Sequence, residues 1–386
     1  MDLERFLERC DVRRGRDYSR MLDDISRRRS ELAEEVIGVN KRISPGRNSR
    51  LRRVLEYVRE RKRRVKPRTP DLSSTFGVDG GEGMREYQGV VLYVTRAAAW
   101  SEDDVLSSWD FGTLSRTRAP QVRVAARRVK LESDVATRAA ERGEVVMLDG
   151  PIVPHHDLKG ANEDSPNRKD YWGQLLRARR RLLEVCEEEG VVVMGVIEDC
   201  KARHLLRSVE AELGEEGSLD SLKALNDPVA LSRRLGGEPV LRVGERTHAF
   251  RLPSSEYPVV REFERATGYE MHTFYVRTTE YSPPVRVEIP EFVDPDEAAS
   301  VVLGTSVEYG GYGIPLPLVM ADEFAKVTRS LIDWLEEGIL EELASRGELD
   351  VIFTVFRRLR RESRPRAVSS EEVRREILHR HGGEAG

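Results

Sequence analysis

Short apolar runs rich in β-branched residues recur along the middle of the chain and predict the strands of a sheet. Residues 145–148 and 191–197 are continuous apolar runs, which is the pattern of strands buried on both faces. Residues 75–79 and 89–95 predict two strands joined by a glycine turn. Two further strands are predicted at residues 272–277 and 285–289, and in the second of these Arg286 and Glu288 share one face.

Helical periodicity occupies the intervening segments. Residues 1–65 are rich in helix formers and broken only around Pro45, so they predict two helices joined by a turn. Residues 121–142 and 167–189 have amphipathic patterns, and a long helix is expected to end near Leu343. Strands that alternate with helices predict an α/β fold.

Two of the predicted strands end at an acid followed by glycine. Asp79 precedes Gly80-Gly81, and Asp149 precedes Gly150. Between them, Glu132 lies within a stripe of small apolar residues on the predicted helix 121–142, where a buried carboxylate needs a partner. If the two strands are neighbours and the helix crosses between them, the three acids converge at one end of the sheet.

Three converging carboxylates repel one another unless cations neutralise them, and an all-oxygen site suits magnesium or manganese. Each acid also has an ordinary interpretation. Asp-Gly is common turn chemistry, and Glu132 could pair with one of the many arginines. The sequence therefore predicts a divalent metal site, with these alternatives open.

Other polar residues are weaker candidates. His155 and His156 are adjacent on a predicted loop and could bind metal, although exposed polar residues are the favoured interpretation. Lys201 and Arg203 follow a predicted strand and could offer positive charge to a phosphate, with ordinary surface charge as the alternative.

Composition narrows the class of protein. Charged residues make up 34% of the 386 residues, which is typical of thermophilic proteins with surface ion-pair networks. The net charge is −4, yet residues 1–66 hold 21 Lys and Arg against 12 Asp and Glu. A second basic run lies at residues 357–366, and both basic ends could contact nucleic-acid phosphates or form solvated surface.

Several classes are not indicated. No apolar run is long enough to span a membrane, no signal-peptide pattern opens the sequence, and no P-loop is present. Three cysteines without paired spacing argue against a disulfide framework. We therefore expect a soluble cytoplasmic protein that does not hydrolyse nucleotides itself.

The order of these motifs resembles the NurA nucleases of archaeal DNA end processing over roughly residues 75–340. The matching motifs are Val78-Asp-Gly-Gly81, Glu132 followed by Val145-Val-Met-Leu-Asp-Gly150, Gly244-Glu-Arg246, Val285-Arg-Val-Glu-Ile289 and Ile314-Pro-Leu-Pro-Leu-Val-Met-Ala-Asp322. The resemblance implies an RNase H-like mixed sheet flanked by helices, with an added N-terminal helical segment. It also implies a homodimer that cuts single-stranded DNA, resects ends 5′ to 3′ with manganese, and works with a HerA-type hexameric ATPase.

The resemblance assigns the metal-binding acids to Asp79, Glu132 and Asp149. The last motif departs from the family pattern, because Ile314 stands where the family has tyrosine and Asp322 where it has histidine. Asp322 can still offer an oxygen to a hard cation, and Tyr312 lies near enough in sequence to supply a phenol.

The expected mechanism is hydrolysis with two metal ions about 4 Å apart, with Asp79 bridging them and Glu132, Asp149 and Asp322 as further ligands. Lys201 or Arg203 would stabilise the scissile phosphate. Two alternatives remain: a DNA-binding adaptor subunit of the same fold with weakened chemistry, and a resolvase-like or transposase-like nuclease.

The predicted organisation has three parts. Residues 1–66 form a basic helical segment, residues 75–345 form the nuclease domain, and residues 346–386 form an Arg-rich extension with a short final helix. Residues 66–70 contain two prolines and predict a linker after the first part.

Overall fold

The computed structural model describes residues 3–115, 119–162 and 170–358. The predicted final helix and most of the basic run after Arg358 lie outside the described residues. The predicted start of the helix at residue 167 does as well, and its described part begins at Tyr171.

A ten-stranded sheet organises the fold in the strand order β1-β9-β11-β12-β6-β5-β2-β3-β4, with β10 paired to β11. Two small hairpins, β7 with β8 and β13 with β14, lie apart from it. The strands span Arg63–Arg64 (β1), Thr75–Glu86 (β2), Val90–Trp100 (β3), Val105–Ser115 (β4), Val145–Asp149 (β5), Val192–Ile197 (β6), Arg234–Leu235 (β7), Glu238–Pro239 (β8), Glu245–Arg246 (β9), Phe250–Arg251 (β10), Met271–Val276 (β11), Val285–Pro290 (β12), Ser306–Tyr309 (β13) and Tyr312–Pro315 (β14).

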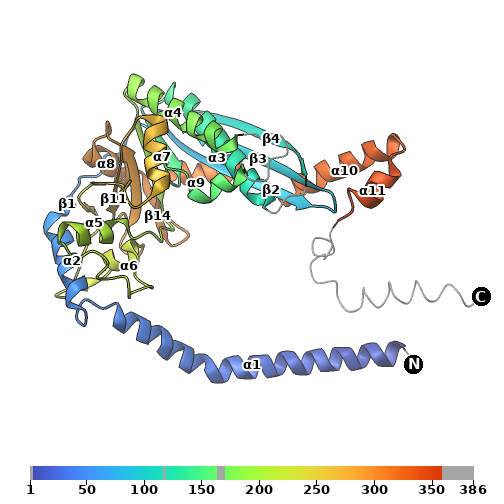
Figure 1. Ribbon diagram of the computed structural model, residues 1–386, viewed down its shortest axis with the longest axis horizontal. Coiled ribbons are helices and arrows are strands. Elements are labelled where there is room, and N and C mark those ends of the chain that lie inside the picture. The colour runs from blue at the N-terminus through green and yellow to red at the C-terminus, as the bar shows by residue number, and fades with distance from the viewer. Residues whose placement is uncertain (1–2, 116–118, 163–169, 359–386) are drawn as a thin grey trace, which may run out of the picture.

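Most helices lie around this sheet and at its two ends, whereas the long N-terminal helix extends away from it (Figure 1). Their bounds are Leu3–Arg42 (α1), Ser49–Arg61 (α2), Pro120–Ala140 (α3), His156–Ala161 (η1, a 3₁₀ helix), Tyr171–Glu189 (α4), His204–Glu212 (α5), Asp227–Leu231 (α6), Pro258–Thr267 (α7), Pro295–Thr305 (α8), Leu316–Ala325 (α9), Arg329–Ser345 (α10) and Leu349–Thr354 (α11).

The strand order β4-β3-β2-β5-β6 is that of an RNase H-like core. Strands β2, β3 and β4 form an antiparallel meander, and β2 then pairs in parallel with β5, which pairs in parallel with β6. Helix α3 connects β4 to β5, and α4 connects β5 to β6. The mixed sheet flanked by helices, predicted above, is confirmed.

The glycine turn predicted after Asp79 is wrong. Strand β2 continues through Gly80, Gly81 and Gly83 to Glu86, and the turn to β3 comes later, where the Tyr87 amide bonds to the Val90 carbonyl. None of the three glycines has a positive φ angle. Instead, because these glycines have no side chains, helices and loops can pack directly against the strand.

Glycines of β2 allow neighbouring helices to approach the strand closely. A Cβ added at Gly77 would lie 2.2 Å from the Pro317 backbone, and one at Gly81 would lie 2.1 Å from the Ala325 carbonyl oxygen, so α9 rests directly on the strand. A Cβ at Gly80 would lie 2.2 Å from Glu132 Oε1 of α3. Because side chains alternate across a strand, α9 and α3 cover opposite faces of β2.

Three other elements are settled by the structure. The long helix expected to end near Leu343 is α10, which ends at Ser345, and the shorter helix α9 precedes it, separated by residues 326–328. The glycine-rich segment around Gly310 is the turn of the β13–β14 hairpin. Strand β4 was not predicted, because polar and glycine residues interrupt its apolar pattern.

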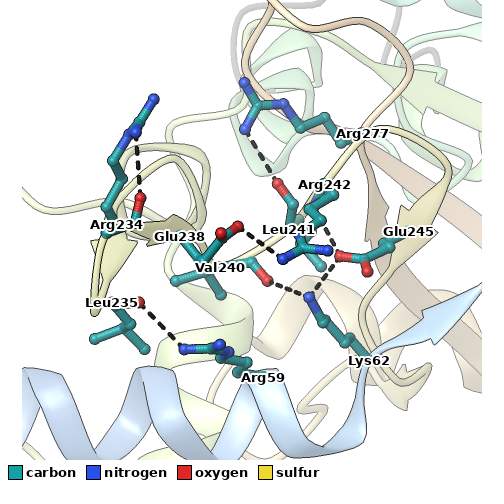
Figure 2. A network of polar contacts seen from close by, with 11 residues as sticks. Arg59, Lys62, Arg234, Leu235, Glu238, Val240, Leu241, Arg242, Glu245 and Arg277 are labelled. Atoms are coloured by element: carbon teal, nitrogen blue, oxygen red, sulfur yellow. Dashed lines mark hydrogen bonds and ion pairs between the residues drawn. The ribbon is translucent and has the colours of Figure 1, made fainter.

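Helix α2 belongs to a second apolar core. Its residues Leu51, Val54, Leu55 and Val58 are buried with side chains from α5, α6 and residues 219–241. Around this core, Arg59 donates to the Leu235 carbonyl and Lys62 donates to the Val240 carbonyl and Glu245 (Figure 2).

The predicted domain boundaries after residues 66 and 345 stay predictions. Among the described residues, no helix has the length and apolarity that crossing a bilayer requires.

Candidate metal centre

Asp79 and Asp149 lie side by side on neighbouring parallel strands. Val78 of β2 pairs with Leu148 of β5, and each acid is the next residue along its strand. Asp79 is 8% exposed, and Asp149 is half-buried at the end of β5. The predicted adjacency of the two acid-bearing strands is therefore confirmed, although β2 does not end at its acid.

Glu132 approaches the same strand from α3. Its side chain is buried and contacts β2 at Gly80, where any side chain would displace it. The Arg128 guanidinium forms an ion pair with Glu132, and it also bonds to Glu82 at 3.2 Å and to the Gly80 carbonyl at 3.3 Å. The alternative interpretation, that Glu132 pairs with an arginine, is therefore confirmed, and the carboxylate lies beside Gly80.

Asp322 comes from α9. It forms an ion pair with Lys326 at 3.3 Å, and its charge raises the pKa values of Asp79, Asp149 and Glu198. Its acid side chain therefore belongs electrostatically to the same site, although its own side chain is 44% exposed.

Glu198 is an acid that the sequence interpretation missed. It follows β6, the third parallel strand, and burial raises its pKa, with further contributions from Asp199 and Asp322. The signal was present in the sequence, because residues 191–197 form a buried strand that ends at Glu198-Asp199. We refer to Asp79, Glu132, Asp149, Glu198 and Asp322 as the acidic cluster.

The pKa values of the two strand acids are raised first by burial and then by the charges of the other acids. Burial raises the pKa of Asp79 to about 7, and the charges of Glu132 and Asp322 add to the effect, while the Gly80 amide opposes it. Burial likewise raises the pKa of Asp149 to about 8, with contributions from Asp79 and Glu198. Negative charge in the cluster exceeds what Arg128 neutralises, and this is the condition under which a cation binds.

The cluster is wider than a single compact ligand set. In the part of the chain that the structure describes, the group of three whose ligand atoms all lie within 4.8 Å of one another is His155, His156 and Asp157. That group is exposed, and each histidine contacts Asp157. The acidic cluster offers only carboxylate oxygens, which are the ligands that hard divalent ions prefer.

The remaining candidates lie at or beyond the margin of the cluster. Lys201 is exposed in a cavity that Glu198 also lines. Arg203 instead donates to the Leu219 carbonyl at 2.9 Å, so it does not face the acids. Tyr312 donates its hydroxyl to Asp199, and Ile314 is buried in the core.

Comparison with known proteins identifies the family of this chain. A family model described as the NurA domain matches residues 73–327. Comparison of the sequence with curated proteins gives no match.

Two solved structures show the same fold. The crystal structure of the NurA nuclease from Sulfolobus solfataricus aligns with 85% of this chain and 98% of its own, with a TM-score of 0.57 and 16% identity. A crystal structure of NurA with manganese aligns with 81% of this chain and 97% of its own, with a TM-score of 0.50 and 12% identity. Both share the fold with this chain.

Proposed function

From the premise that this chain belongs to the NurA domain family, we propose that it is a metal-dependent nuclease that hydrolyses DNA phosphodiester bonds. The observation that carries the proposal is the acidic cluster. Its carboxylates gather from strands β2 and β5, from the residue that follows β6, and from helices α3 and α9, and the pKa values of Asp79 and Asp149 rise to about 7 and 8. Such clustering of perturbed acids is typical of functional sites.

The donor set fits manganese or magnesium. Asp79, Glu132, Asp149 and Asp322 offer only carboxylate oxygens, and no cysteine lies among them. We propose that these four residues hold two ions and that Glu198 completes the set. Ions of this kind lower the pKa of a water nucleophile and stabilise the leaving oxygen of a phosphodiester.

The chain's own residues explain why cleavage would depend on metal. Without a cation, the negative cluster repels the DNA phosphate that must approach it. Asp79 and Asp149 must lose protons to act as ligands, so metal binding should release protons near neutral pH. Arg128 orients Glu132 through its ion pair and thereby fixes one side of the site.

We propose further that the substrate is single-stranded DNA and DNA ends, with endonuclease activity and 5′ to 3′ exonuclease activity in end resection. Lys201 is the proposed cation for a DNA phosphate. A HerA-type hexameric ATPase would supply translocation, because this chain has no P-loop. Helices α1 and α2 are the proposed docking surface, since residues 23–36 of α1 are exposed throughout.

A homodimer is the proposed assembly. Among the described residues β4 is an edge strand of the large sheet, and beside it Trp109, Phe111 and Trp334 are 61%, 58% and 70% exposed. These side chains border a cavity of about 310 Å³ between β4 and α10. Large aromatic residues beside an unpaired edge strand suit a partner copy. Trp334→Glu should shift the sedimentation coefficient from dimer to monomer, and an unchanged dimer would place the interface elsewhere.

The adaptor alternative rests on the last motif. Asp322 already pairs with Lys326, and Ile314 is buried in the core, so neither reproduces the residue that the family pattern has there. Weak activity would follow if Asp322 failed to bind metal. The same cleavage assay separates this alternative from the nuclease proposal.

The decisive experiment measures cleavage of an end-labelled single-stranded oligonucleotide with manganese, with magnesium and with EDTA. Products should form only with a divalent cation, and Asp79→Asn should abolish them. Asp103→Asn removes an exposed acid from the β3–β4 loop and is the matched control. Binding without any products favours the adaptor, and resolution of branched DNA in preference to single strands favours the resolvase alternative.

A further inference from the structure

A cavity of about 410 Å³ opens beside the acidic cluster, and Glu198 belongs to both. Its volume falls within the roughly 300–1000 Å³ of small-molecule sites. The residues around it are Glu198, Asp199, Cys200, Lys201, Asn226, Pro228, Val229, Ser232, Arg233, Pro283 and Tyr312. We call this hollow the side cavity.

Two cations of the side cavity have no acidic partner among the described residues. Lys201 is exposed and forms no ion pair there. Arg233 donates one hydrogen bond to the Asn40 side chain, but its Nε is buried without a hydrogen-bond partner. Burial lowers the pKa of Arg233, which is the expected direction for a cation that lacks an anion. Both cations can therefore bind an anionic ligand.

The rest of the lining suits a nucleotide rather than an inorganic anion. Tyr312, Pro228 and Pro283 supply flat or apolar surface, and Asn226 and Ser232 supply polar groups. The Tyr312 hydroxyl is held by Asp199, so the ring has a defined position. Tyrosine rings stack on bases of single strands with little regard for sequence.

Hydrogen bonds fix the part of the cavity wall that contains Arg233. Directly after Arg233, the segment 234–246 is tied to α2 by Arg59 and Lys62, and internally Arg242 bonds to Glu238 at 2.7 Å (Figure 2). Arg277 bonds to the Leu241 carbonyl in the same network. A preorganised wall lowers the entropy cost of ordering the site when a ligand binds.

We propose that the side cavity holds one unpaired nucleotide of the DNA strand adjacent to the scissile phosphate. Lys201 and Arg233 contact the flanking phosphate, and the base lies against Tyr312. This inference rests on the proposed nuclease function and specifies its substrate. A base can enter the cavity only after it leaves the duplex stack, so the cavity favours single-stranded substrates.

The test measures binding separately from cleavage. In an Asp79→Asn background, which prevents cleavage, the dissociation constant of a fluorescent twelve-nucleotide dT oligomer is measured by anisotropy at several salt concentrations. Lys201→Gln and Arg233→Gln should each weaken binding roughly tenfold. Each should also reduce the slope of log K against log salt by about 0.7, the value for one lost phosphate contact on a single strand.

Matched variants separate contact with DNA from effects on folding. Lys223→Gln removes an exposed charge from the loop before α6 and should leave the affinity unchanged. Tyr312→Phe should retain affinity because the ring remains, whereas Tyr312→Leu should weaken it. A blunt duplex of the same length should be insensitive to Lys201→Gln, and an equal loss for duplex would overturn the assignment of an unpaired nucleotide.

The two proposals fail in different ways. If Lys201→Gln and Arg233→Gln bind like Lys223→Gln while the unmodified protein still cleaves DNA, the side-cavity inference is wrong and the nuclease proposal stands. If oligomer binding depends on Lys201 but the unmodified protein never cleaves with any divalent cation, the nuclease function is wrong and the side cavity remains a nucleotide site.

Discussion

Strand β2 carries buried charge at two places with opposite electrostatics. Toward its start, Asp79 lies in the acidic cluster. Six residues later, Arg85 forms ion pairs with Asp333 and Glu336, and Arg358 also bonds to Glu336. We call Arg85, Asp333, Glu336 and Arg358 the arginine network.

The pKa values distinguish the two places. Burial alone would raise the pKa of Glu336, but hydrogen bonds from Arg358 and Arg85 lower it below its usual value. The hydrogen bond from Arg85 lowers the pKa of Asp333. In the acidic cluster the pKa values of Asp79 and Asp149 rise instead. Burial acts on carboxylates at both places, and the difference is that two arginines compensate it at Glu336 while neighbouring acids add to it at Asp79 and Asp149.

Among the substitutions that test this contrast, Asp149→Asn should have the largest effect. We expect manganese-dependent cleavage to fall at least about 1000-fold, because a carboxylate ligand is lost. The metal-free variant should nevertheless unfold at higher denaturant concentration than the unmodified protein at pH 8, because repulsion within the cluster decreases. Urea denaturation and the cleavage assay measure both effects. If the metal-free Asp149→Asn variant were less stable than the unmodified protein, the claim that the acidic cluster holds an excess of negative charge would be wrong.

Glu336→Gln should have the converse effect. Its removal leaves Arg85 and Arg358 in the arginine network without their shared carboxylate, and we expect the free energy of unfolding to decrease by about 3 kcal/mol. Cleavage per folded molecule should stay unchanged. The exposed neighbour Glu337→Gln is the control for denaturation. Equal stability of the two variants would show that the network contributes little.

The pH dependence of stability should also come from the acidic cluster. In the unfolded chain Asp79 and Asp149 lose their protons near pH 4, whereas in the folded chain they lose them near pH 7 and pH 8. Between pH 4 and pH 8 the folded state therefore binds more protons than the unfolded chain. Their stabilising contribution is complete below the unfolded pKa and is lost as the pH rises through the folded values.

Histidines limit the useful window. Burial lowers the pKa of His204 to about 3 and also lowers that of His248, and these groups act in the opposite direction below pH 6.5. Between pH 6.5 and 8 we expect the metal-free free energy of unfolding to fall by about 2 kcal/mol. The Asp79→Asn/Asp149→Asn double variant should lack most of this decrease. A flat profile for the unmodified protein would mean that its acids ionise normally.

The smallest expected effect comes from Gly80→Ala. The new methyl group would lie 2.2 Å from Glu132 Oε1, so the carboxylate and Arg128 must move. We expect cleavage to fall about tenfold, as for a displaced supporting group at a metal site. Gly112→Ala, whose nearest neighbour is the Tyr93 hydroxyl at 3.4 Å, is the control in another strand. Equal activity of the two variants would show that Glu132 tolerates displacement.

Local patterns in the sequence were sufficient to locate Asp79, Glu132 and Asp149 on two strands and the intervening helix. Hydrophobic periodicity depends on neighbours a few residues apart, so these elements, the two N-terminal helices and the α/β class could be predicted. The sequence also contained the signal for Glu198, because that acid ends a buried strand in the same way as Asp149.

Tertiary structure alone decided what the glycines after Asp79 do and which charges are compensated. Asp-Gly-Gly is typical of a turn, yet here it lies within a strand because α9 and α3 press on its two faces. Likewise, Lys201 and Arg233 meet in the side cavity while Arg203 turns away from it. Packing between distant segments sets these distances, and electrostatic energies depend on distance and burial, which no local pattern in the sequence contains.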